Sequence, residues 1–86
     1  MVIWKYELEV TDRQIVRMPV AADLLSVANQ RGKLCLWAMV DPENPNKVER
    51  DIEIIGTGNS MPEGRRSFIG TAVIDPFVWH VFERFE

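Results

Sequence analysis

The sequence has little of what many small scaffolds and metal sites depend on. Its 86 residues contain one cysteine, Cys35, and one histidine, His80. A single cysteine excludes a disulfide framework within the chain. One cysteine and one histidine also cannot make a recognisable zinc site, so no metal is expected. A chain this short buries only part of its surface, and association with further copies is the common remaining source of stability.

The chain also lacks an excess of positive charge and a long apolar run. Ten Lys and Arg residues stand against thirteen Asp and Glu residues, a formal net charge of −3. General nucleic-acid binding is disfavoured, because that affinity comes from basic side chains that neutralise phosphates. No stretch approaches the roughly 20 apolar residues of a membrane-spanning helix, and the N-terminus lacks the order of a signal peptide. With the lone cysteine, this predicts a protein that stays in a reducing cytoplasm and has no membrane partner.

What the sequence has in abundance is short segments that alternate between apolar and polar side chains. Residues 2–10 alternate strictly, which is the period of a half-buried strand and not that of a helix. Residues 48–55 alternate again, which predicts that Ile52 and Ile54 face inward and that Glu53 faces outward. Both segments are therefore predicted strands.

The run at residues 33–40 is apolar on both faces, which is typical of a central strand covered above and below. The preceding segment, residues 21–30, has two interpretations. Its good helix formers, followed by Gly32, fit a short helix with a C-terminal cap. Alternatively it is a strand, with Leu25 and Val27 on one side, that turns at residues 31–32 into the next strand. We favour the strand, because a short turn containing glycine between two such runs is typical of a hairpin.

Three further strands are predicted from apolar patterning and the turns that bound them: residues 15–18, 68–74 and 77–85. The longest non-periodic segment is residues 56–64. About seven short strands separated by turn signals predict an all-β fold with at most one short helix. We expect a small antiparallel sandwich or barrel, formed as a single domain over residues 1–86.

The predicted strands carry more apolar surface than one small sheet can bury. Exposed, these side chains would make a patch larger than a soluble monomer usually tolerates. We therefore expect a homo-oligomer in which one sheet face packs on another. The side chains expected at that interface are Trp37, Met39, Trp79 and Phe82.

No arrangement of residues typical of catalysis is evident, so the protein is not expected to be an enzyme or to need a cofactor. His80 lies between Trp79 and Val81 in a predicted strand, where a histidine with a satisfied hydrogen bond is the simplest interpretation. Neither a Ser-His-Asp nor a Cys-His arrangement can be argued from it.

The segment 56–64 has two interpretations. Its Gly-Thr-Gly motif lacks the third glycine and the following helix of the dinucleotide-binding fingerprint, so an ordinary turn is the simpler one. The other is an anion site, in which loop amides, hydroxyls and guanidinium groups hold a phosphate or carboxylate. The residues expected to bind such a ligand are Thr57, Gly58, Asn59, Ser60, Arg65 and Arg66.

The order of several motifs resembles a family of small, uncharacterised bacteriophage proteins that form a domain of unknown function. The most specific motifs are Cys35-Leu36-Trp37-Ala38 and Gly56-Thr57-Gly58, and the likeness covers nearly the whole chain. The resemblance implies a phage gene expressed in the cytoplasm of a bacterial host. It also implies a strand at residues 24–29.

Together these observations suggest a non-enzymatic phage accessory protein that binds something of the host's. Its sharpest form is an anti-defence protein that sequesters a small nucleotide immune signal between subunits, with the loop 56–66 and aromatic faces as its binding elements. The alternatives are a protein that binds and inhibits a host or defence protein, and a minor structural or assembly component of the virion. The sequence leaves the ligand, the protein partner and the oligomer number open.

Overall fold

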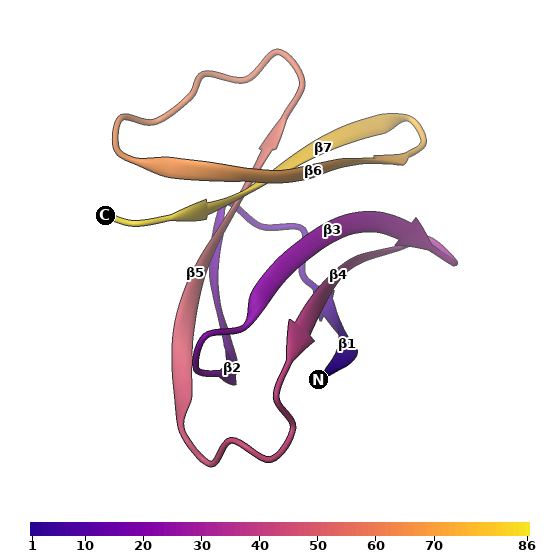
Figure 1. Ribbon diagram of the computed structural model, residues 1–86. Helices are drawn as coiled ribbons and strands as arrows, with labels where there is room; N and C mark the ends of the chain where they lie inside the picture. The colour runs from indigo at the N-terminus through magenta and orange to yellow at the C-terminus, as the bar shows by residue number, and fades with distance from the viewer.

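Seven antiparallel strands form the whole architecture (Figure 1). The computed structural model describes all residues, 1–86. The strands are β1 (Val2–Leu8), β2 (Arg13–Pro19), β3 (Asp23–Gln30), β4 (Lys33–Val40), β5 (Lys47–Gly56), β6 (Arg66–Ile74) and β7 (Phe77–Arg84). The prediction of an all-β fold is confirmed, and no helix forms. The structure accordingly has no helix that is long and apolar enough to cross a membrane.

The strands are divided between two sheets that pack face on face as a sandwich. Sheet A has the order β1-β4-β3, and sheet B has the order β2-β5-β7-β6. The chain crosses between the sheets after β1, β2 and β4, so each sheet combines strands that are distant in sequence. Of the two architectures expected, the sandwich is the one observed.

The apolar run at residues 33–40 becomes β4, the central strand of sheet A, as predicted. β4 pairs with β1 on one side and with β3 on the other. Its inward side chains, which include Leu36 and Val40, are fully buried between the sheets. Trp37 and Met39 point to the outer face of sheet A and are only half-buried. The chain itself thus covers the outer face of this strand at Cys35, which is buried, but only partly at Trp37 and Met39.

The ambiguous segment before β4 forms the strand β3, and residues 31–32 make the predicted turn. The backbone φ angles of Arg31 (55°) and Gly32 (81°) are both positive, as the favoured two-residue hairpin turn requires. The predicted facing of β3 is wrong at one position. A β-bulge between Leu24 and Ser26 makes Leu25 an extra, exposed residue, and Leu24 takes the inward place.

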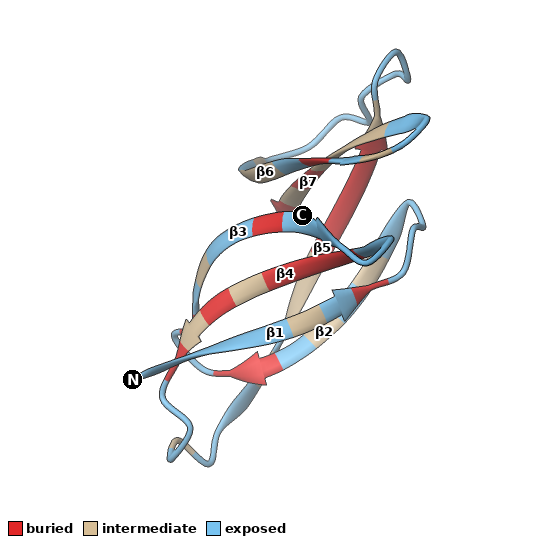
Figure 2. Cartoon of the chain, turned by 90° about the vertical axis from the view of Figure 1, so that its right-hand side faces the viewer, coloured by how far each residue is buried: buried red, intermediate tan, exposed pale blue.

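The core lies between the two sheets, where buried residues concentrate along β4 and β5 (Figure 2). Its fully buried members include Met18, Leu36, Val40, Ile52 and Val81. β6 approaches β3 closely at Gly70. A Cβ at that position would lie 3.1 Å from Val27 Cγ2 and 3.3 Å from the Val27 backbone nitrogen.

A paired arginine and glutamate also lie on the inner face of sheet B. Arg50 Nη2 donates to Glu83 Oε1 at 2.9 Å, and Arg50 Nη1 donates to the Ala22 carbonyl at 2.8 Å. The hydrogen bond to Glu83 raises the pKa of Arg50 above its ordinary value. The pair connects β5 and β7 to the turn that precedes β3, and the sequence pattern gave no sign of it.

Glu53 faces outward as predicted, yet it is buried. Ile52 and Ile54 point into the core as predicted, and Glu53 points to the outer face of sheet B, but it is only 2% exposed. Because β7 lies between β5 and β6, the connection through residues 57–65 must pass over β7. It does so on the outer face, and that crossing buries Glu53.

Candidate functional site

The segment that joins β5 to β6, residues 57–65, is here called the crossing loop. Its first turn is fixed to the sheet by backbone hydrogen bonds. The Thr57 N–H donates to the Val78 carbonyl at 3.2 Å, and the Asn59 N–H donates to the Gly56 carbonyl at 3.1 Å. The start of the loop is therefore held against the start of β7.

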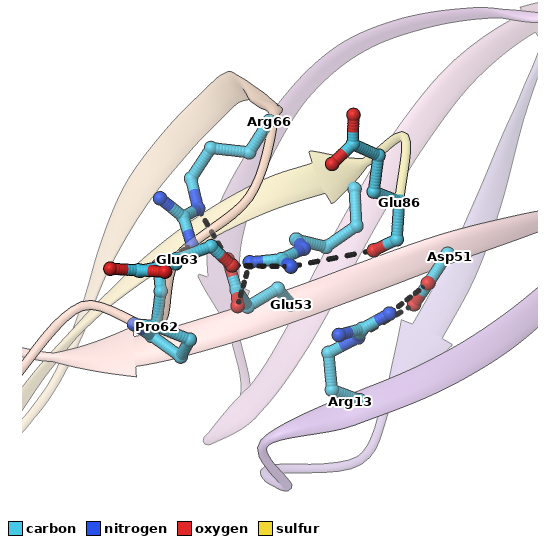
Figure 3. Close-up of polar contacts among 8 residues, drawn as sticks. Arg13, Asp51, Glu53, Pro62, Glu63, Arg66 and Glu86 are labelled. Carbon is cyan, nitrogen blue, oxygen red and sulfur yellow. Dashed lines mark hydrogen bonds and ion pairs between the residues drawn. The ribbon is translucent and has the colours of Figure 1, made fainter.

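The far end of the crossing loop is fixed by an ionic cluster of Glu53, Arg66 and Arg84, called here the Glu53 cluster (Figure 3). Arg66 Nε donates to one carboxylate oxygen of Glu53 at 2.7 Å, and Arg84 Nη1 donates to the other at 3.1 Å. The same two guanidinium groups also reach the loop backbone. Arg66 donates to the Pro62 carbonyl, and Arg84 Nη2 donates to the Glu63 carbonyl at 2.8 Å. One buried carboxylate thus orients two arginines that hold the loop down.

A further ion pair lies next to the Glu53 cluster on the same face of sheet B (Figure 3). Arg13 Nε donates to Asp51 Oδ1 at 3.0 Å across the β2–β5 pair. The hydrogen bond to Asp51 raises the pKa of the Arg13 guanidinium above its ordinary value. Arg13 is consequently already paired in the structure, as Arg66 and Arg84 are.

The two arginines predicted to bind a ligand, Arg65 and Arg66, point in different directions in the structure and have different partners. Arg66 begins β6 and is half-buried in the Glu53 cluster. Arg65 is exposed and donates to Glu86 at 2.7 Å. Successive residues of an extended chain point to opposite sides, which accounts for this divergence.

Trp79 and Phe77 form one wall of a hollow at the start of the crossing loop, called here the aromatic hollow. Their rings are stacked, with centroids 5.4 Å apart and an interplanar angle of 29°. The hollow has a volume of about 460 Å³ and is also lined by Thr57 and Asn59. Trp79 lies directly on Gly56, where an added Cβ would be 3.0 Å from the indole ring. A flat apolar wall beside a hydroxyl and an amide suits a planar ligand that also forms hydrogen bonds.

A second hollow lies on the other side of the crossing loop. It has a volume of about 210 Å³, and its lining includes Asp12, Arg13, Asn59 and Ser60. Asn59 lines both hollows, whereas Arg65 and Arg66 line neither. Gly58 has a φ of 91°, is exposed and lines neither hollow. The structure therefore brings Thr57, Asn59 and Ser60 together and leaves both arginines at the opposite end of the loop.

His80 is held between two threonines on the outer face of sheet B. Its Nε2 lies 2.8 Å from Thr57 Oγ1, and its Nδ1 lies 2.9 Å from Thr71 Oγ1. The expected half-buried histidine with satisfied hydrogen bonds is what the structure contains. No group of three or more His, Cys, Asp or Glu side chains is placed to hold a metal ion.

The four residues expected at an oligomer interface do not share one surface. Trp37 and Met39 lie on the outer face of sheet A, whereas Trp79 points toward the space between the sheets. Phe82 lies on the outer face of sheet B, with its ring centroid 5.3 Å from that of Phe68. Trp37 and Met39 alone form a shared apolar patch, to which Ile3 of β1 belongs as the cross-strand partner of Met39.

Comparison with protein families gives one result, a match over residues 1–86 to the family model described as Domain of unknown function (DUF7352). The chain belongs to this family. Membership confirms the part of the expected resemblance that concerns a domain of unknown function over the whole chain. Comparison with curated proteins and with solved structures finds no match. The fold and the site are therefore interpreted from their own geometry.

Proposed function

We propose that this member of the family is a non-enzymatic accessory binding protein of a bacteriophage, acting in the cytoplasm of the bacterial host. In the most specific version of this proposal, the protein sequesters a small nucleotide signal of the host's defence. The observation that carries the proposal is the aromatic hollow, where the stacked rings of Phe77 and Trp79 lie beside Thr57 and Asn59. Stacking of a base on aromatic side chains contributes about 1–3 kcal/mol per base and tolerates different bases.

The ion pairs of Arg65 and Arg66 limit the kind of ligand that the site would bind. Arg66 is bound to Glu53, and Arg65 is bound to Glu86, so neither guanidinium is free in this structure. Affinity would come from the base on the aromatic wall and from hydrogen bonds with Asn59 and with the Thr57 hydroxyl, which keeps capacity for a second bond beside the one to His80. The proposal therefore favours a ligand with an exposed base and few phosphates over a highly charged one.

Calorimetry against a panel of nucleosides and of linear and cyclic nucleotides tests this proposal. The wild-type protein is expected to bind at least one of them, and Phe77→Ala is expected to weaken that binding about tenfold by removing one stacked ring. Phe68→Ala is the matched control, because Phe68 and Phe77 are 58% and 57% exposed and Phe68 lies outside the hollow. Absence of binding across the panel, or equal losses in both variants, would contradict the proposal.

A second function is favoured by the outer face of sheet A. Ile3, Trp37 and Met39 present apolar surface there that no other part of the chain covers. Aromatic residues and methionine are enriched where proteins bind one another, which fits a host or defence protein that this face would bind and inhibit. Recovery of one host protein with the wild type from infected bacteria, its loss with Met39→Lys and its retention with Ile15→Lys would support this alternative.

A further inference from the structure

The four edge strands of the sandwich differ in how they are protected from pairing with another strand. An edge strand presents unpaired N–H and C=O groups, which natural proteins protect with bulges, charges, proline or a covering segment. β3 and β6 are both protected. Each contains a bulge, at Leu25 and Ile69 respectively, and the two strands pack on each other. Asn29 Nδ2 also donates to the Val73 carbonyl at 3.0 Å, which joins them directly.

β2 is protected in a different way. It carries Arg13 and Arg17 on its outward side and ends at Pro19, which has no N–H to donate. A second copy of β2 would bring four arginines together. Three of the four edges therefore contain features that discourage further pairing.

β1, the other edge strand of sheet A, is less protected (Figure 2). It pairs with β4 without interruption from Val2 opposite Val40 to Leu8 opposite Leu34, and it contains neither a bulge nor a proline. Large apolar side chains are exposed along its first half, with Ile3 60% and Trp4 39% exposed. Its two charged residues have opposite signs. Lys5 donates to Gln30 at 2.6 Å and Glu7 lies 3.9 Å from Lys33, and a second copy of the strand would replace these exposed contacts with facing opposite charges.

We propose that β1 pairs with β1 of a second copy, antiparallel about a two-fold axis at Tyr6. The register follows from geometry. Facing residues in an antiparallel pair must lie on the same face and share one hydrogen-bonding type, so the axis must pass at a residue. An axis at Lys5 or at Glu7 would place two like charges opposite each other, and an axis at Trp4 would leave both Lys5 and Glu7 without a facing opposite charge. An axis at Tyr6 places Lys5 of each copy opposite Glu7 of the other.

This pairing joins two three-stranded sheets into one six-stranded sheet. It also places Trp4 of each copy opposite Leu8 of the other on the inner face, which covers part of the exposed indole. The apolar outer faces that contain Ile3, Trp37 and Met39 become continuous across the axis. The partner is thus a second copy of this chain, and the pairing does not depend on the ligand of the aromatic hollow.

Sedimentation of the wild type and of charge variants over a range of concentrations tests the proposal. The wild type is expected to reach twice the 9.9 kDa mass of one chain as its concentration rises. Lys5→Glu and Glu7→Lys should each weaken the dimer about tenfold or more, because two facing pairs change from attraction to repulsion. The double variant K5E/E7K restores opposite charges at both pairs and should restore the wild-type dissociation constant.

The control is Glu43→Lys, which makes the same change of charge in the exposed loop before β5 and should leave the dimer unchanged. Amide hydrogen exchange gives an independent measurement. Alternate amides of β1 should become protected as the concentration rises, whereas the amides of β2 should not. A wild type that stays monomeric at every concentration, or single variants that dimerise like the wild type, would overturn the proposal. A double variant that dimerises no better than the single ones would overturn the register.

Discussion

Glu53 is the residue on which the shape of the candidate site depends most. Its buried carboxylate accepts hydrogen bonds from Arg66 and Arg84, and these two arginines hold the backbone at Pro62 and Glu63. Removing one partner of a buried pair leaves uncompensated buried charge and costs far more than removing an exposed pair.

We therefore expect Glu53→Gln to lower the free energy of unfolding by about 3 kcal/mol, since it leaves two guanidinium groups buried without a counter-ion. Urea unfolding measures this change. Glu86→Gln is the matched control, because it removes the carboxylate of an exposed pair with Arg65 and should cost no more than about 0.5 kcal/mol. Similar losses in the two variants would show that the Glu53 cluster does not hold the crossing loop in place.

Tyr6 gives a second prediction at the scale of single residues. Its hydroxyl oxygen is buried without a hydrogen-bond partner, and burial raises its pKa above the ordinary tyrosine value. The folded state thus favours the neutral phenol more than the unfolded state does. Stability should be constant below the unfolded pKa, about 10, and should fall as pH rises from there through the folded value.

Tyr6 is the only tyrosine, so an absorbance titration reports it alone. Its midpoint should lie above 10 in the folded protein and shift down in urea. Tyr6→Phe should remove this part of the pH dependence and raise the free energy of unfolding by about 1 kcal/mol at neutral pH, because an unpaired buried hydroxyl is lost. A folded midpoint equal to the unfolded one would contradict the prediction.

At the scale of elements, the strands could be predicted because their signal is local. Alternation fixes which side of a strand each residue faces, and this was right for Ile52 and Ile54. It could not show that Glu53 is buried, because the cover comes from a loop that crosses β7 later in the chain. The bulges at Leu25 and Ile69 could not be predicted from the local pattern either, since a bulge depends on the partner strand. β1 ends at Leu8 and not at residue 10, because the Gln14 side chain bonds both backbone groups of Glu9.

The close approach of β3 and β6 predicts a cost for any side chain at residue 70. Gly70→Ala should lower the free energy of unfolding by about 1–3 kcal/mol, because its Cβ would press on Val27. Denaturant unfolding of the two single variants and of the double variant G70A/V27A measures the coupling. The double variant should lose less than the sum of the single ones, since shortening Val27 removes the nearer contact. Strict additivity would contradict this account.

At the scale of the whole molecule, the apolar side chains expected at an oligomer interface are present, but they lie on different surfaces. Trp37 and Met39 face outward on sheet A, whereas Trp79 lines a hollow and Phe82 contacts Phe68. The sequence could not separate these environments, because the division of strands between two sheets depends on long-range pairing. For the same reason the loop residues Thr57 and Asn59 were identified together with arginines that lie elsewhere.

The topology also predicts slow folding for a chain of this size. β1 pairs with β4 and β2 pairs with β5, so no strand before β3 has a neighbouring strand in sequence as its partner. Such non-local pairing places folding in the millisecond-to-second range. Stopped-flow tryptophan fluorescence measures the rate, and a microsecond relaxation would contradict the prediction.

The fastening of the crossing loop at both ends leaves a short free span between them. Gly58, Ser60 and Met61 are exposed, and their backbone groups take no part in the bonds that fix Thr57, Asn59, Pro62 and Glu63. A cysteine or a short peptide tag introduced at Met61 should therefore leave both sheets intact. A fluorophore attached there would lie two residues along the loop from Asn59, which lines the aromatic hollow, and would report ligand binding without perturbing the strands.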